Sequence, residues 1–248
     1  MKLEKANLTG LQGKMPGFIK PIVGPLARFT FFITARVLRE CYPEKDGRLW
    51  SNRELKKFAH LFEGDVINVS GWEDQDKEGG QYADYFTNKK TYTISNVGEG
   101  ARGTSGDHGE VVLDLEAALP ESYKGSYDTV FNHTTLEHVY DVNTAVKNLC
   151  DLSRDMVVLV VPFLQMVHWE PGSYGDYWRF TPFALAKLLE NNGLHVLYMS
   201  HNDNPLHAVY LFCAATRNPD KWQDHFPRQD ELTRADAPGT LAYRHIVR

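Results

Sequence analysis

Residues 127–139, YDTVFNHTTLEHV, carry the clearest signal for the fold of this chain. The first six, Tyr127–Asn132, are rich in β-branched and aromatic side chains, which favour a strand. A polar turn follows, and the apolar positions of Leu136–Leu149 then recur with the period of a helix. The run therefore predicts a strand that leads directly into a helix, the repeating unit of an α/β protein.

The same kinds of pattern flank this unit on both sides. Six more strands are expected at Asp65–Val69, Thr91–Ser95, Val111–Leu113, Met156–Pro162, His195–Ser200 and His207–Ala214. Further helices are expected at about Pro25–Cys41, Ser51–Phe62 and Thr181–Asn192. Alternating strands and helices predict a mostly parallel sheet with helices on both faces. The last two strands are close together in sequence, so we expect an antiparallel edge.

The pattern divides the chain into three parts. Residues 1–50 are expected to form an N-terminal arm and helical cap, residues 51–216 an α/β domain, and residues 217–248 a polar C-terminal tail. Ser51 is the expected N-cap of the first domain helix, with Glu54 completing a capping box. Thr181 followed by Pro182 reads as the N-cap and first residue of a later helix.

Composition narrows the range of partners. The net charge of −5 argues against a broad phosphate-binding surface, so nucleic acid is not an expected partner. Cys41, Cys150 and Cys213 form no CxxC pair, and the last two lie in apolar surroundings. We expect these two to be buried free thiols in a reducing, cytoplasmic compartment, because Met1–Lys14 contains no apolar run of a secretory signal.

One apolar stretch, residues 18–38, needs separate treatment. Lysine, arginine and proline residues interrupt it, so it does not predict a helix that spans a membrane. It is expected either to pack on the domain as a helix or to form an amphipathic segment that touches a membrane or a protein partner.

Two segments resemble one protein family. Residues 127–139 are similar to the fourth-strand region of class I S-adenosylmethionine-dependent methyltransferases, whose members often read fDvV…LEHv. Residues 161–182 contain VPF, His168, Pro171 and DYWRFTP, and resemble the vPf…H…P…DyyRfT segment of a methyltransferase type 11-like subgroup. The resemblance implies a Rossmann-like fold with a seven-stranded sheet and S-adenosylmethionine as cofactor. Taken alone, residues 127–139 also fit an ordinary strand–helix unit.

The resemblance implies cofactor contacts from residues that follow the first four strands, where ligands bind in such sheets. These residues are Asn68, Ser70, Gly71, Asn96, Asp114, Leu115, Asn132, His133 and Thr135. The family loop reads D/E-x-G-x-G-x-G, but here Asn68 replaces the acid, Ser70 replaces the first glycine and Trp72 is bulky. Asn96 also replaces the acid that usually holds the ribose. The cofactor loop is therefore altered.

The resemblance also implies a substrate side. His168 is the candidate general base, since imidazole accepts a proton near neutral pH. The candidate substrate contacts are Glu137, His138, Tyr174, Asp176, Tyr177 and Arg179. For Asp176 and Arg179, an ion pair that braces the loop is an equally good interpretation. The ten histidines include no HxxxH or HxH pair, so the sequence predicts no metal site.

Three functions are compatible with these patterns. The first is a methyltransferase that acts on a hydroxyl of a glycan or small metabolite. The second is a non-catalytic methyltransferase-like module that binds or regulates a partner, which the altered loop favours. The third, a nicotinamide-dependent reductase, is weaker, because the glycine fingerprint of that class is absent too.

Overall fold

The computed structural model describes residues 20–41, 46–98, 110–202 and 209–227. The chain forms two compact units, residues 1–42 and residues 43–248. In the first unit, helix α1 (Lys20–Cys41) has 22 residues and starts five residues before its expected beginning at Pro25. Leu26, Phe29, Ile33 and Val37 are exposed along it. Among the described helices, none has the length and apolar character needed to cross a membrane.

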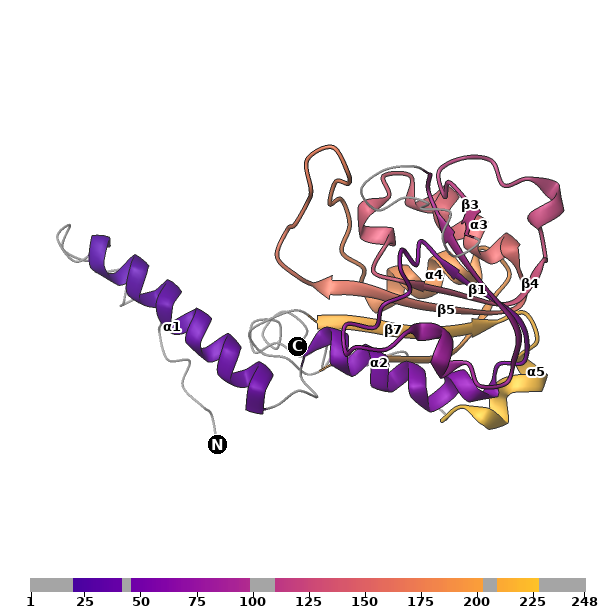
Figure 1. The fold of residues 1–248 in the computed structure, drawn as a ribbon, viewed down its shortest axis with the longest axis horizontal. Helices are drawn as coiled ribbons and strands as arrows, with labels where there is room; N and C mark the ends of the chain where they lie inside the picture. Colours follow the sequence, from indigo (N-terminus) through magenta and orange to yellow (C-terminus); the bar gives the residue numbers. More distant parts are fainter. Residues whose placement is uncertain (1–19, 42–45, 99–109, 203–208, 228–248) are drawn as a thin grey trace, which may run out of the picture. The chain divides into compact units, whose positions relative to one another are not determined.

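The second unit is built on one sheet of seven strands (Figure 1). The strands are β1 (Gly64–Val69), β2 (Lys89–Asn96), β3 (Val111–Val112), β4 (Tyr127–His133), β5 (Ser153–Leu164), β6 (His195–His201) and β7 (Val209–Thr216). Their order is β3-β2-β1-β4-β5-β7-β6, and only the pairings of β7 are antiparallel. This confirms the expected Rossmann-like class I fold, with a mostly parallel sheet and an antiparallel pair at one side.

Two hydrophobic clusters hold helices on the two faces of this sheet. Along β5, Val157, Leu159 and Val161 belong to one cluster, and Met156, Val158 and Val160 belong to the other. Alternate side chains of a strand point to opposite faces, so a strand buried on both sides is apolar throughout. Helices α3 (Val142–Leu152) and α4 (Pro182–Glu190) pack in the first cluster, and α2 (Gly47–Phe58) packs in the second.

Two helix starts differ from the expectation. Helix α2 begins at Gly47, because the Asp46 carboxylate accepts hydrogen bonds from the backbone of Arg48 (3.0 Å) and Leu49 (3.1 Å). Ser51 is therefore a buried residue inside the helix, and its expected capping role is wrong. The expected helix from Leu136 is a 3₁₀ turn at Leu136–His138 followed by α3, which Asp141 caps. The caps of α4 at Thr181 and Pro182 are confirmed.

The expected polar tail starts with a packed segment. Helix α5 (Pro219–Trp222) and a 3₁₀ turn (Gln223–His225) follow β7, and the Trp222 and Phe226 side chains are buried in the second cluster. Trp222 Nε1 and Lys221 Nζ donate hydrogen bonds to the buried Asp155 carboxylate at 3.0 and 2.7 Å. Residues 228–248 of the expected tail lie outside the described part. Cys150 and Cys213 are buried free thiols, as expected.

Candidate functional site

A hollow lies at the edge of the sheet where β1, β2 and β4 end. Parallel pairing aligns Val69 with Ser95 and with Asn132, so the three strands end side by side. The cavity has a volume of about 560 Å³, within the usual range for small-molecule sites. Eight of the nine expected cofactor residues line it: Asn68, Ser70, Gly71, Asn96, Asp114, Leu115, His133 and Thr135. Asn132 is not among the lining residues; it is fully buried, and its Nδ2 donates to Val69 O at 2.8 Å.

The loop after β1 keeps an unusual backbone conformation at every second residue. Ser70, Trp72 and Asp74 have φ angles of 56°, 49° and 60°. These are the three positions to which the family pattern assigns glycine. Left-handed φ costs a residue with a side chain roughly 1–2 kcal/mol, and this loop adopts it three times without glycine, the residue type that adopts it most easily. Gly71 lies between them, and a Cβ there would lie 2.6 Å from Asn68 Nδ2.

Asn68 braces this loop. Its Nδ2 donates to Asp74 Oδ1 at 2.7 Å, and Tyr92 Oη donates to the same oxygen at 2.6 Å. Asp74 Oδ2 accepts a hydrogen bond from Ala83 N at 2.8 Å. The Asp74 side chain is buried, and burial raises its pKa although these hydrogen bonds oppose the shift. Asn68 therefore has a structural partner in the place where the family carries an acid.

Asn96 is engaged in a similar way. Its Oδ1 accepts a hydrogen bond from Trp72 N at 2.8 Å, and its Nδ2 faces Trp72 O at 3.3 Å. Gly71 N donates to Ser95 O at 3.1 Å. The ends of β1 and β2 are thus joined by the protein's own hydrogen bonds, and the Trp72 side chain lines the hollow.

Arg48 also lines the hollow, and the sequence interpretation missed it. Its guanidinium donates to His133 Nδ1 (2.8 Å), Tyr82 Oη (3.0 Å) and Thr134 Oγ1 (3.1 Å). Tyr82 and Thr134 accept through neutral hydroxyl groups. His133 is uncharged too, because burial and the nearby Arg48 charge lower its pKa well below the usual value. The one sequence signal that could have pointed to Arg48 was Asp46, which is as good an N-cap as Ser51. A helix that begins after Asp46 places Arg48 in its first turn.

On the other side of the hollow, Glu137 is fully buried. Neither of its carboxylate oxygens has a hydrogen-bond partner among the described residues. Burial raises the pKa of Glu137 to about 8. His138 Nε2 lies 3.8 Å from Glu137 Oε1, and His138 Nδ1 donates to Gly175 O at 2.6 Å. Of this pair, only His138 lines the hollow.

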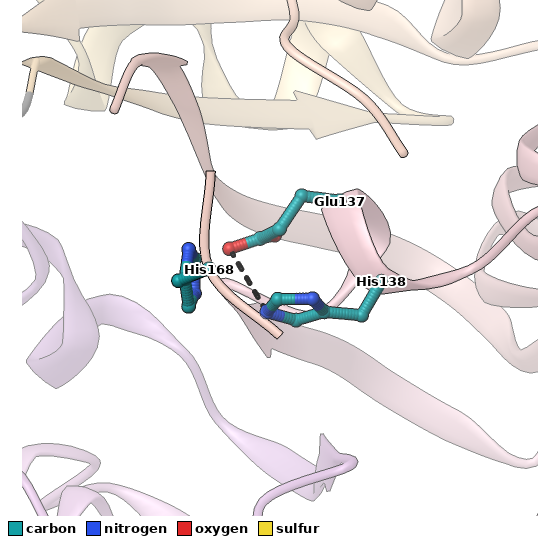
Figure 2. Close-up of side chains that lie close together, drawn as sticks. All are labelled: Glu137, His138 and His168. Carbon is teal, nitrogen blue, oxygen red and sulfur yellow. Dashed lines mark ion pairs between the residues drawn. The ribbon is translucent and has the colours of Figure 1, made fainter. Parts of the chain in front are cut away.

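His168 lies behind His138 and does not line the hollow. The two imidazole rings meet edge to face, with their centroids 4.8 Å apart. His168 Nδ1 is 3.3 Å from Asp176 Oδ2, and the His168 backbone N–H donates to the same oxygen at 2.7 Å. Figure 2 shows Glu137, His138 and His168 gathered around a common point.

Asp176 and Arg179 form the loop-bracing pair. Arg179 Nη1 and Nη2 donate to the two Asp176 oxygens at 2.5 and 2.8 Å, and Arg179 Nε donates to Gln165 O at 3.2 Å. Burial alone would raise the pKa of Asp176, but the hydrogen bonds from Arg179 and from the His168 backbone lower it to about 2. Neither residue lines the hollow, whereas Tyr174 and Tyr177 do.

The structure also reveals a group that sequence spacing could not detect. Ligand atoms of Glu137, His138 and His168 all lie within 4.8 Å of one another. His138 ends the 3₁₀ turn after β4 and His168 follows β5, so no short HxxxH or HxH pattern marks them. The expectation of no metal site, which rested on the absence of such patterns, therefore stays a prediction, and these three residues are a candidate group that it did not consider.

Among known proteins, this chain is similar to several solved structures. The sequence matches no protein-family model and no curated protein. The Burkholderia thailandensis 1,6-didemethyltoxoflavin-N1-methyltransferase, crystallised with S-adenosylhomocysteine, is 16% identical, with a TM-score of 0.47 over 78% of this chain and 88% of its own. Magnesium protoporphyrin IX methyltransferase from Synechocystis PCC 6803, crystallised with S-adenosylmethionine, is 14% identical, with a TM-score of 0.45 over 68% of this chain and 79% of its own.

A third similar structure has a different named activity. The [4+2]-cyclase SpnF is 11% identical, with a TM-score of 0.49 over 70% of this chain and 84% of its own. Similarity at this level does not establish the activity of this chain.

Proposed function

We propose that this chain is an S-adenosylmethionine-dependent methyltransferase that acts on a hydroxyl group of a glycan or small hydroxylated metabolite. The observation that carries the proposal is the convergence of the segments after β1, β2, β3 and β4 on one hollow of about 560 Å³. Open α/β sheets bind ligands at this edge.

The charges around the hollow suit the cofactor. Its methionyl carboxylate needs a cationic partner, and Arg48 is a guanidinium whose hydrogen-bond partners are all uncharged. Its ribose hydroxyls need an acceptor, and Asp114 lines the hollow with an exposed side chain. In this assignment Asn68, Ser70, Gly71 and Asn96 shape the cofactor loop.

The acceptor would enter beside His138, Tyr174 and Tyr177. In the transfer, the acceptor oxygen forms a bond to the methyl carbon while the bond from sulfur to that carbon breaks. The hydroxyl proton passes to an imidazole nitrogen of the His138 and His168 pair, and neutral S-adenosylhomocysteine leaves. Such a reaction depends mainly on alignment of the two reactants.

A specific observation favours a second candidate, a non-catalytic methyltransferase-like binding module. Asn68 and Asn96 are committed to bonds within the protein, and Trp72 projects into the lining of the hollow. In this case the hollow would not accept the cofactor.

Calorimetry with S-adenosylmethionine and S-adenosylhomocysteine on the full chain tests the proposal. We expect binding of both, weakened by about tenfold or more in Arg48→Gln, because a charge-assisted contact is lost. His195→Gln, at the opposite end of the sheet, is the control and should bind normally. No binding heat with either ligand would favour the non-catalytic module.

A further inference from the structure

The Glu137 carboxylate lacks the partners that a buried polar group normally has. It is fully buried, and both of its oxygens lack a hydrogen-bond partner among the described residues. Buried carboxylates in proteins are paired, hydrogen-bonded or bound to a metal ion. The two Glu137 oxygens are therefore available as ligand atoms.

The two neighbouring histidines are held in the orientation that metal ligands adopt. His138 Nδ1 donates to Gly175 O at 2.6 Å, which places the lone pair of the neutral ring on Nε2. His168 Nδ1 lies 3.3 Å from the Asp176 carboxylate, which favours the same tautomer. A metal-binding histidine generally donates its other N–H to a carboxylate or a backbone carbonyl. Here Nδ1 of His138 has Gly175 O as its acceptor, and Nδ1 of His168 has Met166 O at 3.3 Å with the Asp176 carboxylate beside it.

We propose that Glu137, His138 and His168 bind a divalent first-row transition-metal ion such as Zn²⁺ at the rim of the hollow. Two imidazole nitrogens and one carboxylate are a common ligand set for catalytic zinc, which keeps a further position for a small ligand. The ligand atoms lie within 4.8 Å of one another (Figure 2). Ligands of one zinc ion are about 3.4 Å apart, given bonds of roughly 2.1 Å, so side-chain rotations would have to close the site.

The location gives the ion access to the hollow. His138 lines the cavity, whereas Glu137 lies behind it. An ion at this point would present its open position toward the region beside Tyr174. Resting on the proposed function, the acceptor hydroxyl would then bind the metal, which would lower its pKa so that its proton is released to solvent. His138 and His168 would both be ligands, and neither would accept the proton.

Metal binding is tested directly on the full chain after removal of metal with a chelator. Titration with zinc chloride in a calorimeter should show one saturable site per chain, and Co²⁺ should give visible absorption bands. Glu137→Gln, His138→Gln and His168→Gln should each weaken zinc binding by about tenfold or more. Asp176→Asn, which changes the carboxylate beside His168 and also its ion pair with Arg179, should weaken zinc binding by roughly 10–100-fold.

His195→Gln provides the matched control, since it removes an exposed histidine at the start of β6, away from the hollow. It should bind zinc as the unmodified chain does. Absence of saturable zinc and cobalt binding would overturn the proposal. Zinc binding that survives unchanged in Glu137→Gln and His138→Gln would overturn it too, because the ion would then sit elsewhere.

The same samples separate this inference from the proposed function. Binding of S-adenosylmethionine by a chain that takes up no metal would leave the proposed function standing and refute the metal site. Zinc binding that depends on Glu137, without any binding of S-adenosylmethionine, would do the reverse.

Discussion

The two sides of the hollow differ in how many hydrogen bonds their buried carboxylates accept. On the side of β1 and β2, Asp74 receives hydrogen bonds from Asn68, Tyr92 and Ala83. On the side of β4, Glu137 is equally buried and neither oxygen has a partner among the described residues. The first side is completed by the protein itself. On the second side, a bound ligand could occupy the two Glu137 oxygens, so a further binding site should be sought there.

The largest effect is expected from Asp74→Asn. The amide retains one accepting oxygen but turns an N–H₂ group toward the Ala83 N–H, so a buried bond is lost and two donors face each other. We expect a loss of about 2–3 kcal/mol in the free energy of unfolding, measured by urea denaturation. The exposed Asp84→Asn is the control. A loss below about 0.5 kcal/mol, the usual range of surface changes, would show that the loop is not held by Asp74.

A third buried carboxylate, Asp155, extends the comparison to pH. Burial alone would raise its pKa, but hydrogen bonds from Lys221, Asn218, Thr216 and Trp222 lower it below the usual value. Its stabilising contribution is therefore present above its unfolded pKa and is lost as the pH falls through its folded pKa. Asp155→Asn should cost about 2 kcal/mol at neutral pH.

The test is urea denaturation from pH 7 down into the acid range. The difference in stability between the unmodified chain and Asp155→Asn should shrink as the pH falls. A difference that stays constant with pH would mean that the charge of Asp155 does not stabilise the fold.

Glu137→Gln makes the same chemical change as Asp74→Asn on the opposite side of the hollow, and it should have the opposite sign. Without metal, it removes the cost of burying an ionisable group whose oxygens have no hydrogen-bond partner among the described residues, with His138 Nε2 3.8 Å from Glu137 Oε1. We expect a gain of about 1–2 kcal/mol in the free energy of unfolding, measured in the presence of a chelator. A loss of stability would reveal a partner for Glu137 and would end the contrast between the two sides.

The smallest effect on stability is expected from Trp72→Gly. Glycine adopts the φ of 49° without strain, while the loss of the ring removes some packing, so stability should change by less than about 1 kcal/mol. The hollow becomes larger, and binding of S-adenosylmethionine should tighten by about tenfold, or 1.4 kcal/mol. Calorimetry measures this change, and Trp178→Phe is the control. Weaker binding would show that the ring stacks on the cofactor.

Strands were easier to predict than helix starts. The run Met156–Pro162 is apolar on both faces, which is unmistakable for a strand in the middle of a sheet, and β5 contains it. The start of helix α2 was predicted too late because Asp46 and Ser51 are both good N-caps. The choice between them depends on tertiary packing, which the sequence does not show. Arg48 was missed as a consequence.

The candidate site was only partly predictable, for a related reason. Residues after parallel strands must lie at one edge, so the convergence of Asn68, Asn96 and Asp114 followed from topology. Whether each side chain faces the hollow or a neighbour depends on loop paths. The sequence therefore could not show that Asn96 bonds to Trp72, or that His168 is brought to Glu137.

The left-handed residues at positions 70, 72 and 74 have a consequence for how such chains are identified. A sequence motif specifies residue types, whereas the φ angles of a loop describe the backbone conformation that those residue types favour. In this chain the φ angles at positions 70, 72 and 74 are positive, although none of the three residues is glycine. Distant members of a fold could be sought by alternating positive φ after the first strand, even where not one glycine of the motif survives.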